Sequence, residues 1–217
     1  MRVEPVSPEV LVGRLVERVA EGLVAARAAD GPDRRWRVLL DGAPPTGPGG
    51  LADALVEPLR ARGHAVVRVS AGDFLRPGGV RFEHGREDPD ALLDDALDSG
   101  ALIREVLDPL GPGGDGSYLP ALWDAARERS ARATRLPTAP GTVLLLDGGL
   151  LLGRWLPADL TVHLAVRPDT LARRTPPGDA WRLPAEERYR VEADPEGTAD
   201  VVVRVDDPRR PGWVVER

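Results

Sequence analysis

A chain of 217 residues with 42 % apolar and 29 % charged side chains has the composition of a folded globular protein, and its length fits one domain spanning residues 1–217. The net charge of −6 disfavours a protein that coats nucleic acid or an anionic membrane, and the lack of cysteine excludes disulfides, thiolate nucleophiles and Cys-ligated zinc. The first residues lack the apolar core of a signal peptide, so we expect a cytoplasmic protein.

The basic residues are unusual in type. All 29 members of the Lys+Arg count are arginine, and asparagine and glutamine are also missing. The lack of lysine excludes Schiff-base catalysis, a lysine general base and the lysine of a phosphate-binding loop. The three histidines have no metal-ligand spacing.

The first part of the chain predicts a helix, a strand, a turn and a second helix. Ser7 is a candidate helix cap, and helically spaced apolar residues follow it within the N-terminal segment 1–30. Residues 36–40 are an apolar run typical of a buried strand, and a glycine-rich turn comes next. A helix is expected through Leu51 and Leu59, kinked or shortened by Pro58.

The rest of the chain alternates between apolar runs and helical patterns. Four more runs predict strands, namely 65–69, 142–146, 160–166 and 201–205, and helical patterns fall near 89–107, 170–174 and 185–191. This alternation predicts an α/β fold of three layers with a central parallel sheet of about five strands. The segments 110–118 and 167–184 are predicted as loops.

The glycine-rich turn has the frame of a P-loop. A strand, Gly-x-x-x-x-Gly and a helix place backbone N–H groups around a phosphate, and Gly42 and Gly47 have that spacing. The next two positions should be Lys and Ser or Thr, but Pro48 and Gly49 stand there. The loop is therefore a degenerate Walker A motif. Its predicted phosphate-contacting residues are Gly42, Thr46, Gly47, Gly49 and Gly50.

Three prolines weaken the turn further, because Pro44, Pro45 and Pro48 have no backbone N–H group to donate. Two other interpretations of the turn remain open. One is a structural Gly/Pro turn without a ligand. The other is the dinucleotide-binding pattern Gly-x-Gly-x-x-Ala, which starts at Gly47.

The order of several short motifs resembles that of the uridine kinase family of P-loop phosphotransferases, from about Arg35 to Pro208. After the turn come Ser-Ala-Gly-Asp-Phe at 70–74, Glu-Asp-Pro-Asp-Ala at 87–91, Gly-Gly-Asp-Gly-Ser-Tyr at 113–118 and Val-Leu-Leu-Leu-Asp-Gly at 143–148. The resemblance implies a P-loop kinase fold with a reduced lid at 167–190, ATP and Mg as cofactors, and a nucleoside-like small molecule as partner. No nucleic acid or membrane partner is expected.

The resemblance also assigns roles to individual residues. Asp147 matches the family's magnesium-facing acid, and Asp73 lies one position after the family's catalytic base, where Gly72 stands here. Glu87 matches the acid that holds the sugar hydroxyls, and Tyr118 matches an aromatic residue beside the nucleobase. The lid arginines that clamp phosphates correspond to Arg173, Arg174 and Arg182.

Each of these residues also has a structural interpretation. Asp73 can cap its own loop, Glu87 can belong to a solvated helix-cap cluster, and Tyr118 can anchor its own turn. Asp147 can form an Asp-Gly turn at a strand end, and the lid arginines can be solvated surface residues.

Three functions are compatible with these residues: a divergent phosphotransferase in which arginine replaces the lysine, a pseudokinase that binds a ligand or regulates, and an enzyme turned to another reaction. The missing lysine, hydroxyl and base argue against ordinary ATP-dependent kinase chemistry. We predict that the 42–50 turn and Asp147 lie at the same sheet edge, that Glu87 and Tyr118 line an adjoining cavity, and that the turn binds ATP poorly.

Overall fold

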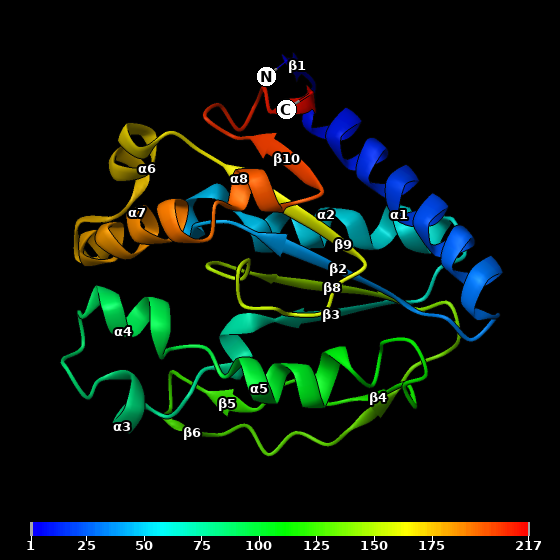
Figure 1. Cartoon of the computed structure of the whole chain (residues 1–217), viewed down its shortest axis with the longest axis horizontal. Helices are drawn as coiled ribbons and strands as arrows, with labels where there is room; N and C mark the ends of the chain where they lie inside the picture. The colour runs from blue at the N-terminus through cyan, green and yellow to red at the C-terminus, as the bar shows by residue number, and fades with distance from the viewer. Residues whose placement is uncertain (1, 217) are drawn as a thin grey trace.

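A seven-stranded sheet forms the centre of the structure, a computed structural model that describes residues 2–216 (Figure 1). Its strands, in spatial order, are β1 (Arg2–Pro5), β11 (Gly212–Glu216), β10 (Val201–Arg204), β9 (Leu160–Ala165), β2 (Trp36–Asp41), β8 (Val143–Gly148) and β3 (Val66–Ser70). The five from β10 to β3 are parallel and coincide with the five predicted strands, so the predicted α/β fold is confirmed.

The strands β1 and β11 were not predicted, and they extend the sheet with antiparallel pairs. They bring the two ends of the chain side by side (Figure 1). All four residues of β1 are exposed, so the segment lacks the apolar run that marked the other strands. Its pairing with β11 depends on the tertiary structure.

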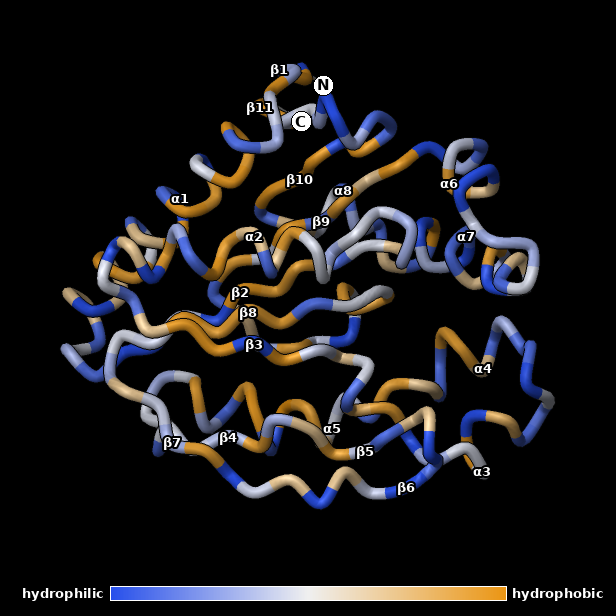
Figure 2. The backbone as a smooth tube through the Cα atoms, turned by 180° about the vertical axis from the view of Figure 1, so that it is seen from behind, coloured by the Kyte–Doolittle hydropathy of each residue, from blue (hydrophilic) through white to orange (hydrophobic). Residues whose placement is uncertain are grey.

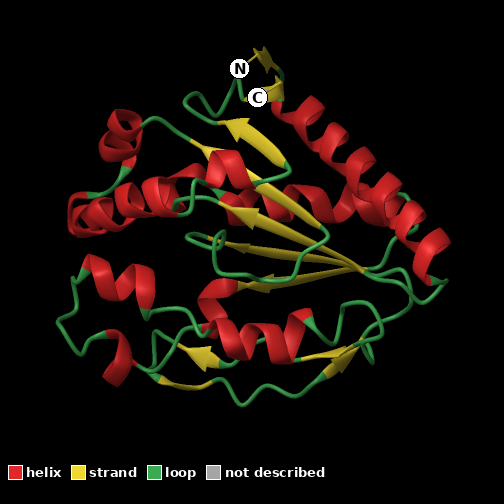
Figure 3. Ribbon diagram, viewed as in Figure 1, coloured by secondary structure: helices red, strands yellow, loops and turns green. Residues whose placement is uncertain are grey.

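Helices cover both faces of the sheet (Figure 3). The α-helices are α1 (Pro8–Asp30), α2 (Pro48–Ala61), α3 (Gly78–Arg81), α4 (Pro89–Asp94), α5 (Ser99–Leu102), α6 (Pro168–Arg174), α7 (Leu183–Glu192) and α8 (Pro195–Thr198). Tighter or wider turns are the 3-10 helices η1 (Pro44–Thr46), η2 (Ala71–Phe74) and η4 (Pro177–Arg182) and the π-helix η3 (Ile103–Leu107). None of the helices among the described residues combines the length and the apolar character needed to cross a membrane.

Two large apolar clusters hold the layers together. One face of the sheet packs against α1 and α2, with Leu23 and Leu55 fully buried there. The other packs against η2, α5 and η3, with Phe74 and Leu102 at its centre. Strands buried on both faces need apolar side chains at nearly every position, which explains why they are the most hydrophobic part of the chain (Figure 2).

Proline affected two local predictions. The helical pattern predicted near 170–174 is confirmed as α6, but the loop predicted over 167–184 also contains η4, because Pro177 occupies a first-turn position where a missing N–H group costs nothing. A kink or a shortened helix was predicted at Pro58, and α2 includes Pro58 and ends at Ala61.

Outside the main sheet the chain forms two small sheets, β4 (Ser117–Tyr118) with β7 (Leu136–Pro137) and β5 (Trp123–Asp124) with β6 (Arg129–Ser130). The parallel strands all end at the side where α3, α4, α6 and α7 gather (Figure 1). Ligands of open α/β sheets bind at the carboxyl ends of the strands, so we expect a binding site at this edge.

Candidate functional site

The glycine-rich turn leaves the carboxyl end of β2 and closes tightly. The N–H group of Gly42 donates to the carbonyl of Gly148 at 3.0 Å, which ties the turn to β8. A Cβ atom on Gly42 would lie 2.5 Å from Thr46 Oγ1, and Gly47 adopts the left-handed conformation at φ 79°. Both positions therefore require glycine for the turn to fold in this way.

Few amide groups of the turn are free to hold a phosphate. Pro44, Pro45 and Pro48 have none. The N–H groups of Thr46 and Gly47 donate within the turn, to Ala43 at 2.8 Å and to Pro44 at 3.1 Å. The Thr46 hydroxyl likewise donates to the Ala43 carbonyl, at 2.7 Å. The amide groups of Thr46 and Gly47 are thus used within the turn, and the start of α2 presents amide groups outward.

Asp147 is the residue before the end of β8, and it lies at the same sheet edge as the turn, as predicted. In the sheet it pairs with Leu40, and the next residue pairs with Asp41, the last residue before the turn. Its carboxylate accepts a hydrogen bond from the Arg68 guanidinium, which also binds Asp53 of α2. The carboxylate is nearly buried.

This ion pair bears on whether ATP–Mg fits the edge. A Cβ atom on Gly49, where a magnesium-binding hydroxyl would belong, would lie 3.3 Å from Asp147 Oδ2 and 4.0 Å from Arg68 Nη2. The guanidinium thus supplies the positive charge beside Asp147 that a metal ion would otherwise bring. With no hydroxyl, no lysine and few free amides, these residues do not fit ATP–Mg.

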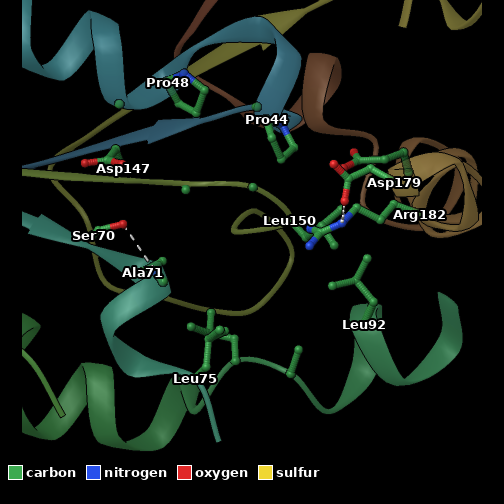
Figure 4. Close-up of a pocket in the computed structure, with 18 of the residues that line it drawn as sticks. Pro44, Pro48, Ser70, Ala71, Leu75, Leu92, Asp147, Leu150, Asp179 and Arg182 are labelled. Atoms are coloured by element: carbon green, nitrogen blue, oxygen red, sulfur yellow. Dashed lines mark hydrogen bonds and ion pairs between the residues drawn. The ribbon is translucent and has the colours of Figure 1, made fainter. Parts of the chain in front are cut away.

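A cavity of about 760 Å³ opens at this edge, within the size range of small-molecule sites. Pro44 and Pro48 line one side, with Leu75 and Leu92 across from them, while Asp147 and the Arg182–Asp179 pair lie at opposite ends (Figure 4). The wall is therefore apolar in the middle and charged at both ends. No cluster of three or more His, Asp or Glu side chains suited to a metal ion occurs among residues 2–216.

Asp73 lies in η2, directly after β3, next to cavity-lining residues but outside the lining set itself. The hydroxyl that caps this turn belongs to Ser70, which accepts from the Gly72 N–H at 3.3 Å. Burial raises the pKa of Asp73, and the negative charges of Asp147 and Asp124 add to the increase. Its role as a base stays a prediction.

Glu87 and Tyr118 were expected in the wall of the cavity. Glu87 is exposed on the loop before α4, and it does not line this cavity. It does line an open hollow beside the cavity, together with Arg86 and Asp88. Tyr118 lies in the apolar cluster under the other face of the sheet, where burial raises its pKa. It does not line this cavity, and its place among buried apolar side chains indicates a packing role.

Of the three lid arginines, only Arg182 lines the cavity. Arg173 donates to Thr170 Oγ1 at 2.9 Å within α6, and Arg174 donates to the carbonyls of Val205 and Asp206 beyond β10. Arg173 and Arg174 thus hold their own surroundings in place, in contrast to the expected phosphate clamp.

A buried polar network behind the turn was missed. Asp41 is fully buried, and its carboxylate accepts from His163 Nδ1 at 2.7 Å, from the Tyr189 hydroxyl at 2.9 Å and from the Leu151 N–H at 2.9 Å. The network joins β2, β9 and α7. The position of Asp41, directly before the first glycine of the turn, was the only indication of this network in the sequence. Its partners His163 and Tyr189 lie 122 and 148 residues away, so local patterns do not identify them.

Glu186 of α7 is a second residue that was missed. It lines the cavity wall, and burial raises its pKa to about 7, with a further increase from the charge of Asp41 and an opposing effect of Arg182. A carboxyl group that holds its proton near neutral pH can donate as well as accept a hydrogen bond.

This raised pKa makes stability depend on pH. An unfolded chain loses the Glu186 proton near pH 4 to 5, but the folded protein keeps it until about pH 7. The folded state therefore binds more protons in that range, and its stability falls as the pH rises. Urea unfolding between about pH 5 and about pH 8 should show a loss of up to about 3 kcal/mol that is absent in Glu186→Gln. Parallel curves for the two proteins would contradict this.

No protein-family model and no curated protein sequence matches the chain. Solved structures do. A possible uridine kinase from Bacillus stearothermophilus has a TM-score of 0.63 at 19 % identity, covering 87 % of this chain and 98 % of that one. A fructose transport system kinase assigned in a Silicibacter species has a TM-score of 0.59 at 20 % identity, covering 86 % and 98 %.

The D-glycerate 3-kinase of Cryptococcus neoformans has a TM-score of 0.55 at 15 % identity, covering 85 % of this chain and 80 % of that chain. The chain therefore has the fold of P-loop kinases, as the motif order predicted. The strand order agrees, because β8 lies between β2 and β3, whereas the dinucleotide-binding fold pairs its first two strands directly. This rules out the dinucleotide interpretation of the turn.

Proposed function

We propose that this chain uses a P-loop kinase fold to bind a small organic molecule and does not transfer phosphate from ATP–Mg. The observation that carries the proposal is the ion pair of Arg68 with Asp147 at the place where a P-loop kinase needs a metal-facing carboxylate. The cavity beside it has the volume for a nucleoside-sized ligand.

The ligand class follows from the resemblance and from the neighbouring folds. The motif order resembles the uridine kinase family, and the names of the solved neighbours, a possible uridine kinase, a fructose transport system kinase and a D-glycerate 3-kinase, mention uridine, fructose and D-glycerate. All three are small compounds with several hydroxyl groups. A protein that kept this binding cavity but lost the nucleotide loop would act as a ligand sensor or regulator.

Calorimetry with ATP–Mg, ADP, uridine, fructose and glycerate tests the proposal. We expect no heat from either nucleotide and binding of a member of the panel or a phosphorylated derivative. The variant Pro48→Lys, Gly49→Ser, Arg68→Leu restores the cation and hydroxyl and frees Asp147, so it should gain ATP–Mg affinity. A matched control keeps the first two changes and replaces the exposed Arg60 of α2 with leucine instead of Arg68. Micromolar ATP–Mg binding by the unmodified protein would refute the proposal.

A divergent phosphotransferase is the second candidate, and one contact favours it. The Arg68 guanidinium lies close enough to Gly49 to act as the cation that the turn lacks. The single substitution Arg68→Leu has different expected results for the two candidate functions. A phosphotransferase would lose ATP-dependent activity, whereas a binding protein would have no such activity to lose. A coupled assay for ADP release in the presence of each hydroxyl compound separates them.

A further inference from the structure

Four arginines line the cavity, and only two of them are paired with a carboxylate. Arg81 binds Glu128, and Arg182 binds Asp179 at 3.3 Å. Among residues 2–216, no carboxylate side chain forms an ion pair with either Arg86 or Arg154. Among the described residues, the wall therefore presents two guanidinium groups with no carboxylate in ion-pair contact.

Arg154 is the more informative of the two. Its Nε donates to the Leu150 carbonyl at 2.6 Å, and its Nη2 donates to the Leu93 carbonyl. These bonds hold the guanidinium plane in one orientation and leave Nη1 without a partner among the described residues. Burial lowers the pKa of Arg154, and the charges of Asp94 and Asp41, which lie beyond ion-pair contact, oppose that effect. A guanidinium keeps its charge at ordinary pH. A partly buried charge with no carboxylate in contact gains from a ligand anion.

Arg86 is held by an aromatic ring. The guanidinium groups of Arg81 and Arg86 lie over the Phe82 ring, 4.5 Å and 4.9 Å from its centroid, and all three residues line the cavity. Arg86 comes before α4, and Arg154 contacts the Leu93 carbonyl near the end of that helix. A helix of six residues is about 9 Å long, so the two groups flank a short stretch of the wall.

The carboxyl groups of the wall cancel these charges only in part. Asp147 is bound by Arg68 and Asp179 by Arg182. Asp88 accepts the N–H groups of Asp90 and Ala91, both at 2.9 Å, as the cap of α4. Glu186 keeps its proton up to about pH 7, because burial raises its pKa. Asp88 keeps its negative charge, because N–H donors stabilise a carboxylate without neutralising it. Against this one charge stand the guanidinium groups of Arg86 and Arg154, so the wall has an excess of positive charge while Glu186 is protonated.

We propose that the cavity binds an organic anion, a compound that carries a phosphomonoester or carboxylate group, with Arg154 as the principal anion receptor and Arg86 as the second. The inference deepens the proposed function, on which it rests, by choosing charged over neutral ligands. Guanidinium groups bind both kinds of anion through paired N–H donors.

Matched pairs of ligands test the inference by calorimetry at low salt. Uridine is compared with uridine 5′-monophosphate, fructose with fructose 6-phosphate, and glycerol with glycerate, and inorganic phosphate serves as the bare anion. In at least one pair the anion should bind about tenfold or more tighter than its neutral partner. A preference in the first two pairs identifies a phosphomonoester, and one in the third pair alone identifies a carboxylate.

Two variants and a control assign the preference to these residues. Arg154→Met and Arg86→Met should each reduce it at least about fivefold, whereas Arg129→Met, an equal charge loss on the exposed β6, should leave it unchanged. Within residues 2–216, no hydrogen bond joins the Arg86 side chain to the backbone, so its variant stays informative if Arg154→Met fails to fold. Neutral ligands that bind as tightly as the anions, or anions that do not bind at all, would overturn the inference. Neither result would decide whether the protein binds ATP–Mg, which tests the proposed function separately. An anion preference that survives both cavity variants would also overturn the inference.

Discussion

Replacing Asp159 with alanine should lower the free energy of unfolding by about 3–5 kcal/mol, because it leaves two buried arginines without their shared counter-charge. The carboxylate, 8 % exposed, accepts from the Arg37 N–H at 2.8 Å, from Arg37 Nε at 3.0 Å and Nη2 at 3.1 Å, and also from Arg34. Urea unfolding at neutral pH measures the loss.

The same residue should make stability depend on acid. Burial by itself raises the pKa of Asp159, but the hydrogen bonds and charges of Arg37 and Arg34 outweigh it and lower the pKa below its ordinary value. The contribution of Asp159 to the free energy of unfolding is therefore complete above its pKa in the unfolded chain, about 4. It is lost as the pH falls through the lower pKa of the folded state. The difference between wild type and variant should shrink in that acidic range.

A surface pair provides the control for Asp159. Glu57 and Arg60 are both exposed on α2, and Glu57→Ala should cost less than about 1 kcal/mol. If Asp159→Ala were as mild as Glu57→Ala, the two arginines would have to be stabilised by other groups, and the buried network would not be essential for stability.

Replacing Asp41 with alanine should also cost about 3–5 kcal/mol, because three buried donors lose their acceptor at once. They are the Leu151 N–H, His163 Nδ1 and the Tyr189 hydroxyl. Tyr189→Phe removes one of these bonds and keeps the ring in place, so its cost should be about 1–2 kcal/mol. Chemical unfolding of both single variants and the double variant forms a cycle.

The cycle reports whether Asp41 and Tyr189 act on one another. Residues in one hydrogen-bond network show a coupling energy of about 0.5–3 kcal/mol. Additive losses would mean that α7 is held against β2 by packing alone. A coupling within that range would show that the network fastens α7, with Glu186 on it, to the strand that leads into the glycine-rich turn.

The parallel sheet could be predicted because its signal is local. Strands such as β8, with five buried residues in a row, must be apolar on both faces, and this leaves a continuous run that needs no knowledge of neighbours. The strand β1 carries no such signal, since its exposed residues are ordered only by pairing with β11 at the other end of the chain.

The candidate site was predictable only in part, and Arg68 shows why. An arginine inside a strand suggests a solvated position, and nothing near it in sequence indicates Asp147, which lies 79 residues away. The strand order places β8 next to β3, with Ser70 opposite Asp147, so Arg68 on the same face reaches that carboxylate. The prediction that Tyr118 lines the cavity was wrong for another reason. A match to a family position on a loop does not determine which way the side chain packs.

The motif order and the residue types of the turn were enough to predict the P-loop kinase frame and the loss of its donors, because proline has neither a backbone N–H group nor a side-chain charge in any fold. The three-dimensional arrangement was needed to show that Arg68 neutralises Asp147, that Asp41 joins three elements, and that Arg154 lines the cavity with no carboxylate in ion-pair contact among the described residues. Charges are balanced between side chains distant in sequence, and the order of the strands determines which of them meet.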